Sequence, residues 1–462
     1  MAMNGIGAGR PLDRKRIVAA LAIALALPAC ADDLVVPDYN NPSLEELQEN
    51  PTRTAVITAT QGLLIGARTG IANQAGFIAH TGILGRESYT FDNSDPRYVN
   101  EMVHGTLDPG NGAFGGSGWS PRYANIRNAN IVLHALDRVT GLTAEELEGI
   151  RGFAKTIQAL DYLLVIALRD ENGAVIDVDR DITEEPGPIV GKDEVLAHVS
   201  SLLDEAAAHL DAAGASFAFS LSSGFAAFDD PASFRTFNRA LKARVEAYRG
   251  NYDAVLDALD ESFLDASPGA DLYLGAYHAF QADAPNGLFN PLIVAHPSIR
   301  DDAELQADGT TLDQRVLDKT EVLDEPAASG GLTTNLGFTI YTAANAPAPI
   351  IRNEELILLR AEAYIGLGMI PQAAADINFI RVNSGGLEAR TDLDATNIVD
   401  ELLRQRRFSL LLEGHRWIDM RRFGRLGDLP IDRDGDVVPS AFPIPRAECI
   451  ARGAPVPCGV GS

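Results

Sequence analysis

The sequence predicts a mainly α-helical protein with long irregular loops. Apolar residues recur at helical spacing in several blocks, whereas the alternation of apolar and polar residues that is typical of strands is sparse. A seven-residue stretch also occurs twice in helical surroundings. The predicted helical blocks are residues 52–68, 119–138, 143–170, 192–213, 233–262, 351–383 and 396–423.

The N-terminus has the charge and hydropathy pattern of a secretory signal. A basic patch at residues 10–16 precedes an uncharged run at residues 17–27. That run has about half the ~20 residues that a membrane-spanning helix needs. Small residues then follow, as they do before a cleavage site. We therefore expect residues 1–29 to be a signal peptide.

The end of this signal carries a candidate modification site. Leu27-Pro28-Ala29-Cys30 resembles the bacterial lipobox, in which the cysteine is acylated and becomes the first mature residue. The alternative, a buried cysteine after a short core helix, does not explain the basic patch. We expect lipid on Cys30, and an extended tether over residues 30–50. Ser43 and Glu46 have capping-box spacing, which indicates a first helix there.

Composition limits the binding partners. The net charge is −26, and such an acidic chain does not suit nucleic acid, whose phosphates require clusters of Lys and Arg. The same charge opposes electrostatic adhesion to anionic lipid, so membrane attachment would depend on the covalent anchor. After the signal, no apolar stretch reaches membrane-spanning length. We expect residues 51–462 to form one domain.

Two further cysteines lie close together near the C-terminus. Cys449 and Cys458 flank a Pro-rich segment, and an exported protein could join them in a disulfide. The alternative is a pair of free thiols or half of a metal site, for which no further cysteine exists.

The repeated stretch refines the helical prediction. Residues 244–250 (RVEAYRG) recur as residues 360–366 (RAEAYIG), and an Ala-rich helix follows each copy. In the second copy Ala361, Tyr364 and Ala373 have the small–aromatic–small spacing of tetratricopeptide helix pairs. Such hairpins bury their apolar faces by stacking on one another. The prediction is a scaffold of tetratricopeptide-like hairpins.

The most specific segment, residues 406–424 (RRFSLLLEGHRWIDMRRFG), resembles the C-terminal signature of the SusD/RagB family of nutrient-binding outer-membrane lipoproteins. Four weaker matches, at residues 119–130, 237–244, 349–364 and 442–445, occur along the chain in the same order as in the family. Ser409 departs from the pattern, where the family usually has Glu. From the residues alone, we expect Glu413, Arg416, Asp419 and Arg422 to form a row of alternating charge on a helix that holds the fold.

The resemblance implies a function. A SusD-like protein would be lipid-anchored on the outer membrane, exposed at the surface, and would pass a nutrient to a SusC-like TonB-dependent transporter. The expected ligand is an oligosaccharide. The alternative is a lipid-anchored helical-repeat scaffold that binds a protein or peptide partner, and a secreted hydrolase is a weaker third hypothesis.

Catalytic and cofactor signals are weak. The sequence has no nucleophile elbow and no Gly-rich phosphate loop, and the glycines at residues 110–118 are interpreted as a flexible loop. The acidic residues Asp432, Asp434 and Asp436 begin like a calcium loop but lack its glycine and final glutamate. We expect no enzyme activity, no cofactor and no metal.

The ligand is expected to contact aromatic residues on loops, because such side chains stack on sugars and carry polar neighbours. The alternative is that these aromatics fasten long loops to the core. Residues 263–349 are too long for a plain connection, and we expect a variable ligand-binding insertion there. The candidate residues are Tyr89, Phe91, Asn93 and Tyr98 in one cluster, and Tyr273, Tyr277, His278 and Phe280 in a second, with Asp92 and Phe289 beside them.

Overall fold

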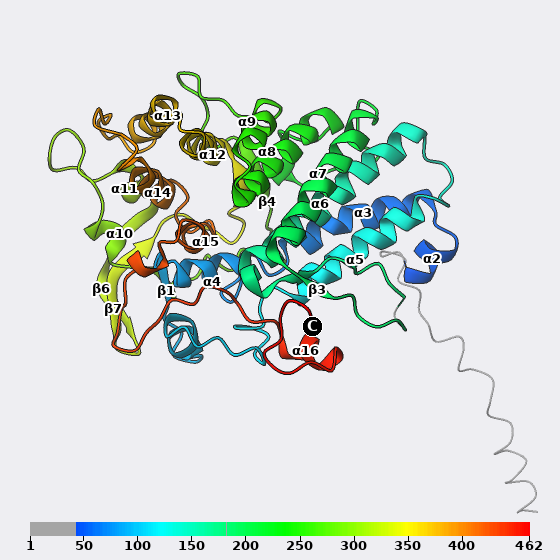
Figure 1. Cartoon of the computed structure of the whole chain (residues 1–462), viewed down its shortest axis with the longest axis horizontal. Coiled ribbons are helices and arrows are strands. Elements are labelled where there is room, and N and C mark those ends of the chain that lie inside the picture. Colours follow the sequence, from blue (N-terminus) through cyan, green and yellow to red (C-terminus); the bar gives the residue numbers. More distant parts are fainter. Residues whose placement is uncertain (1–42, 182) are drawn as a thin grey trace, which may run out of the picture. The chain divides into compact units, whose positions relative to one another are not determined.

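The structure, a computed structural model, describes residues 43–181 and 183–462 (Figure 1). The predicted signal peptide at residues 1–29, the lipidation site at Cys30 and most of the tether lie outside the described residues. Leu44–Ser462 form one unit. Within the described part, no helix combines the length and the hydropathy needed to cross a membrane.

Leu44–Glu49 form helix α2, as the spacing of Ser43 and Glu46 predicts, so this part of residues 30–50 is not an extended tether. Leu47 is buried in the main core, which gives this short segment a reason to be helical. Glu46 also accepts a hydrogen bond from the Thr52 hydroxyl at 2.9 Å, so the helix is joined to the start of the next one.

Five long helices pack side by side in the N-terminal half of the described chain (Figure 1). They are α3 (Arg53–Arg68), α5 (Ser120–Ala135), α6 (Ala144–Arg169), α7 (Lys192–Asp211) and α8 (Pro231–Arg249). Side chains of Thr52, Thr143 and Asp230 cap α3, α6 and α8. These caps satisfy N–H groups that the first turn leaves without a partner in the helix.

The repeated stretch ends the first helix of two stacked hairpins. The hairpins are α8 with α9 (Tyr252–Asp260), and α12 (Asn353–Gly366) with α13 (Ile370–Asn383). Gly366 permits their close approach, since a Cβ there would lie 2.1 Å from the Tyr252 ring. Arg244 of the first copy donates to Glu355 of α12 at 2.6 Å. The predicted mainly α-helical, tetratricopeptide-like fold is confirmed.

The predicted block at residues 396–423 is two helices and not one. They are α14 (Ile398–Ser409) and α15 (Arg416–Arg422). The chain between them turns through positive φ at Leu412 (56°) and Gly414 (94°), which a helix does not allow. A Cβ at Gly414 would lie 2.7 Å from the Phe77 ring, so this glycine also permits close packing.

The segment at residues 263–349 contains more structure than the sequence suggests. Strands β6 (Thr320–Ser329) and β7 (Leu332–Phe338) form an antiparallel hairpin. Buried Leu332, Thr334 and Leu336 alternate with exposed residues on β7. The same region carries β4 (Gly275–His278), β5 (Ile293–Ala295), α10 (Ser298–Asp301) and α11 (Gln314–Lys319).

Short elements complete the described unit. α4 is the one that the sequence pattern misses most clearly: every residue from Ile78 to Leu84 is buried, so no polar face reveals a helical period. β1 pairs with β5, β2 with β3, and β4 with β8. These elements are α4 (Phe77–Leu84), β1 (Ser88–Thr90), the π-helix η1 (Tyr98–Val103), η2 (Asp170–Asn172), β2 (Ala174–Val175), β3 (Ile189–Val190), η3 (Ser223–Phe225), β8 (Ala348–Arg352), η4 (Leu426–Asp428) and α16 (Arg446–Ala451).

Candidate functional site

Three segments that are far apart in the sequence surround a large cavity. Its volume is about 640 Å³, and residues 69–77, 109–118 and 445–450 supply most of its lining. This volume lies in the range of small-ligand sites. We call this cavity the loop pocket.

One wall of the loop pocket is the glycine-rich segment, which is held by a buried carboxylate. Glu101 Oε1 accepts hydrogen bonds from the backbone N–H groups of Asp108 at 3.0 Å and Gly115 at 3.3 Å. Its other oxygen accepts from the Asn111 amide at 3.3 Å. Phe114 is buried 4.9 Å from the Tyr98 ring, centroid to centroid. The segment is a loop, as predicted, but these contacts fasten it, so the prediction that it is flexible is wrong.

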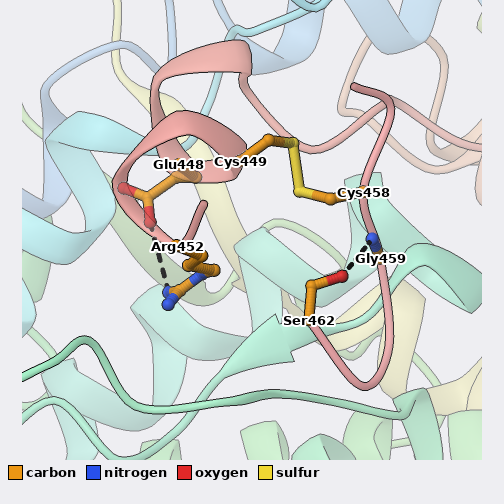
Figure 2. The surroundings of a disulfide bond; sticks show 6 residues. All are labelled: Glu448, Cys449, Arg452, Cys458, Gly459 and Ser462. Atoms are coloured by element: carbon orange, nitrogen blue, oxygen red, sulfur yellow. Dashed lines mark hydrogen bonds and ion pairs between the residues drawn. A yellow bond between two sulfur atoms is a disulfide. The ribbon is translucent and has the colours of Figure 1, made fainter. Parts of the chain in front are cut away.

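A second wall is α16, fastened by a disulfide. Cys449 and Cys458 are bonded, and Figure 2 shows the bond between α16 and the last residues of the chain. Gly459 N–H donates to Ser462 Oγ at 3.2 Å beside it. The Arg446 backbone N–H donates to the Pro109 carbonyl at 3.0 Å, which joins this wall to the glycine-rich one.

Residues 69–77, which we call the floor of the loop pocket, are held in place by a buried ion pair. Arg122 donates to Asp161 Oδ1 at 2.5 Å and to the Ala67 carbonyl at 2.7 Å. It also binds the Gly66 carbonyl at 3.0 Å, so it fixes the end of α3 from which residues 69–77 continue. Burial raises the pKa of Asp161 to about 6, although Arg122 and Asn125 oppose the shift.

The lining combines polar and apolar groups, and its two arginines, Arg122 and Arg446, pair with Asp161 and Asp108. Residues with hydroxyl, amide and guanidinium groups stand beside apolar ones, and the glycines leave backbone N–H and carbonyl groups uncovered by side chains. Such a mixture can bind hydroxyl groups and the apolar face of a ring. The polar residues are Thr69, Asn73, Ser117, Ser120, Arg122 and Arg446; the apolar ones include Phe77, Leu164, Leu168 and Ile450.

The first predicted aromatic cluster belongs to the core. Tyr89, Phe91 and Tyr98 are 3%, 6% and 5% exposed and pack in one hydrophobic cluster. Their predicted contact with a ligand does not fit this burial; they follow the alternative, in which aromatics fasten loops to the core. Asn93 is exposed, and its Oδ1 lies 3.3 Å from Ser329 Oγ.

The four residues of the second predicted cluster differ in burial and in their contacts. Tyr273 is 59% exposed and its ring lies beneath the Arg352 guanidinium, 5.2 Å away. The hydroxyl of Tyr277 donates to the Tyr273 carbonyl. His278 is buried, and burial, with Arg122 and Arg68 nearby, lowers its pKa to about 3. Phe280 packs at a core cluster. None of these four residues lines the loop pocket, and their ligand contact stays a prediction.

Exposed Phe289 belongs to a segment that packs on residues 72–74. Its segment packs on the pocket floor, because Gly287 N–H donates to the Ala72 carbonyl at 2.7 Å. Asn290 Nδ2 donates to Gln74 Oε1 at 2.6 Å. Phe289 is 54% exposed, so its aromatic ring is accessible to solvent, although it does not line the loop pocket.

The signature block, residues 406–424, is mostly buried and joins helices. Asp419 accepts hydrogen bonds from Arg406 at 2.7 Å and from Arg422 at 3.0 Å. Glu413 pairs with Arg352 at 2.8 Å instead of with a helical neighbour. The predicted single row of alternating charge is therefore wrong, since the chain turns before Arg416, but the block packs within the fold and lies outside the loop pocket.

The acidic run near the C-terminus is used in ion pairs. Asp432 lies 2.8 Å from His296 and 3.1 Å from Arg86. Asp436 lies 2.9 Å from Arg433. In residues 43–181 and 183–462, no group of three or more His, Cys, Asp or Glu side chains has an arrangement that could hold a metal ion.

Sequence reasoning missed the loop pocket. Its residues are small or polar, and they meet only after the chain has folded. The glycines at residues 110–118 were the available signal, because dense glycine allows backbone to approach a ligand closely. Gly115 is needed for packing within the loop itself, because a Cβ there would lie 2.4 Å from the Asp108 carbonyl oxygen.

Comparison with known proteins supports the resemblance. Residues 333–443 match the model of the SusD family. A SusD superfamily protein from Bacteroides vulgatus is 15% identical, with a TM-score of 0.65 over 87% of this chain and 97% of that one. A SusD-like carbohydrate-binding protein from Bacteroides fragilis is 15% identical, with a TM-score of 0.67 over 88% and 99%.

A third structure, a laminarin-binding SusD-like protein, is 17% identical, with a TM-score of 0.63 over 87% of this chain and 98% of that one. A comparison with curated proteins found no match. The predicted resemblance to the SusD/RagB family is thus confirmed by the sequence match near the C-terminus and by the fold over most of the chain.

Proposed function

We propose that this chain, with its SusD-like fold and signature, is a glycan-binding lipoprotein of the outer membrane. In this proposal Cys30 carries the lipid, the loop pocket binds an oligosaccharide, and a TonB-dependent transporter receives it. The protein acts by binding, without covalent chemistry. The lipobox-like sequence supports the anchor, and the resemblance supports the partner.

The loop pocket carries the proposal for the ligand. Its 640 Å³ accommodate a few sugar rings. Hydroxyl and amide side chains line it beside apolar Phe77. Polar groups that flank apolar surface are the pattern that sugars require. The similar structures described as carbohydrate-binding and laminarin-binding agree with this ligand class.

Calorimetric titration of the purified full-length protein with a panel of oligosaccharides, laminarin fragments included, tests the proposal. Asn73→Ala and Ser120→Ala should each weaken binding by about two- to tenfold, the usual net contribution of one hydrogen bond. The matched control is Asn128→Ala, an exposed amide on α5 outside the pocket lining. Absence of binding across the panel, or an equal loss in the control, would contradict the proposal.

A further inference from the structure

A second cavity, of about 270 Å³, lies between α14, α15 and the segment that follows them. It shares no lining residue with the loop pocket. Three arginines, Arg404, Arg407 and Arg416, line it over an apolar base that includes Phe408 and Met420. We call it the arginine pocket. Its volume is below the usual range for oligosaccharide-sized ligands, so it fits a small group.

The carboxylates at this cavity already have partners. Asp302 Oδ2 accepts from Arg407 at 2.6 Å. Asp400 and Asp428 both pair with Arg425, at 2.8 and 3.4 Å. Arg407 and Arg425 thus pair with all three carboxylates but leave one negative charge over, and the two further guanidinium groups at the cavity exceed it by one positive charge.

Those two groups are Arg416 and Arg404. No carboxylate of the described residues lies within ion-pair distance of Arg416; one of its amino groups donates to the Leu403 carbonyl at 3.4 Å, and its Nε has no hydrogen-bond partner there. Arg404 Nε lies 3.8 Å from Glu304 and 4.0 Å from Glu401, and its side chain is 46% exposed.

The buried carboxyl group of Glu87, near Arg416 and Arg407, does not balance this charge at neutral pH. Burial raises its pKa to about 8, against the opposing effect of the two arginines. The pKa of Arg416 is lowered to about 10 by burial and by Arg407. A buried guanidinium without an anion is costly, and a bound anion would remove much of that cost.

We propose that the arginine pocket is a binding site for the oxyanion group of a small ligand, a sulfate, phosphate or carboxylate. Arg416 binds the anion from the buried side and Arg404 from the solvent side. Arginine suits this task because its planar fork donates two parallel hydrogen bonds to an oxyanion. Arg404 extends from α14 and Arg416 from α15, and both line the cavity. The proposal does not depend on glycan binding at the loop pocket.

Calorimetric titration of the full-length protein at pH 7 tests this site. Sodium sulfate, sodium phosphate and sodium glucuronate are compared with sodium chloride at matched ionic strength, which separates the three sources of an oxyanion. We expect saturable binding of at least one of them, weakened tenfold or more in Arg416→Gln and about threefold in Arg404→Gln. The control is Arg53→Gln, which removes a similarly exposed arginine (41%) far from this cavity in the sequence.

The outcomes are separable. Saturable binding that Arg404→Gln weakens and Arg53→Gln leaves unchanged supports the site. Should Arg416→Gln fail to fold, the exposed Arg404 decides, because its replacement leaves the buried pairs intact. The proposal is overturned if no oxyanion binds above chloride, or if Arg404→Gln and Arg53→Gln bind alike. Neither result affects the oligosaccharide titration.

Discussion

The signature block and the loop pocket use charge in opposite ways. In the block, buried carboxylates and guanidinium groups pair with each other across helices, as Asp419 of α15 does with Arg406 of α14, and Arg422 of α15 with Glu362 of α12. At the loop pocket, the buried carboxylate of Glu101 binds backbone N–H groups of a glycine-rich loop. The first arrangement fixes helices, and the second shapes a surface.

This difference explains why the sequence indicates the family resemblance more clearly than it indicates the ligand. Side-chain pairs across helices need particular residues at particular spacings, so they leave a sequence signature. A loop held by its backbone needs only small residues and one carboxylate, and many sequences satisfy that. The residues that reveal the fold are therefore expected to affect stability, and those at the loop pocket to affect binding.

The largest effect is expected from Asp419→Asn. Burial alone would raise the pKa of Asp419, but Arg406 and Arg422 hold it well below its usual range. The amide would leave the buried guanidinium of Arg406 without its counter-ion, at a cost of about 3–5 kcal/mol, whereas Arg422 keeps its pair with Glu362. Urea unfolding would measure this loss, while glycan affinity of the folded protein should stay near the wild-type value.

Asp400→Asn is the matched control for that substitution. Asp400 is 65% exposed and pairs with exposed Arg425, so its loss should cost under about 1 kcal/mol. Equal destabilisation by the two substitutions would show that burial of the pairs is not what stabilises the signature block.

The two regions also differ in how far the sequence predicts them. The helices follow from local apolar periodicity, and Leu410, Leu411 and Trp417 are buried as that pattern requires. The sequence does not predict the turn between α14 and α15, because Leu412 adopts a positive φ and leucine rarely does so. The loop pocket could not be predicted, since no local pattern brings residues 69–77, 109–118 and 445–450 together.

A pH dependence of intermediate size should come from Glu87, beside the signature block. Its folded-state pKa, about 8, is higher than the 4.5 expected in the unfolded chain. The folded protein therefore holds this proton more tightly, and the resulting stability is complete below about pH 4.5 and lost as pH rises through 8. The loss should be on the order of a few kcal/mol.

The measurement is urea unfolding of the wild type and Glu87→Gln between pH 4.5 and 8.5. Glutamine keeps the shape and does not titrate, so the difference in unfolding free energy isolates Glu87. The unfolding free energy of the wild type minus that of Glu87→Gln should fall as pH rises. A difference that stays constant would show that Glu87 titrates at an ordinary pKa.

The smallest effect on stability is expected at the loop pocket, where two glycines give a matched pair. A Cβ at Gly115 would lie 2.4 Å from the Asp108 carbonyl oxygen, whereas a Cβ at Gly112 meets nothing within 4 Å. Gly115→Ala should cost about 1–3 kcal/mol through overpacking, and Gly112→Ala less than about 0.5 kcal/mol. Because Gly115→Ala must move the wall that Glu101 holds, it should weaken glycan binding by about tenfold, measured by calorimetry. If both variants bind as the wild type does, the glycine-rich wall does not contact the ligand, and the exposed aromatics Tyr273 and Phe289 become the better candidates.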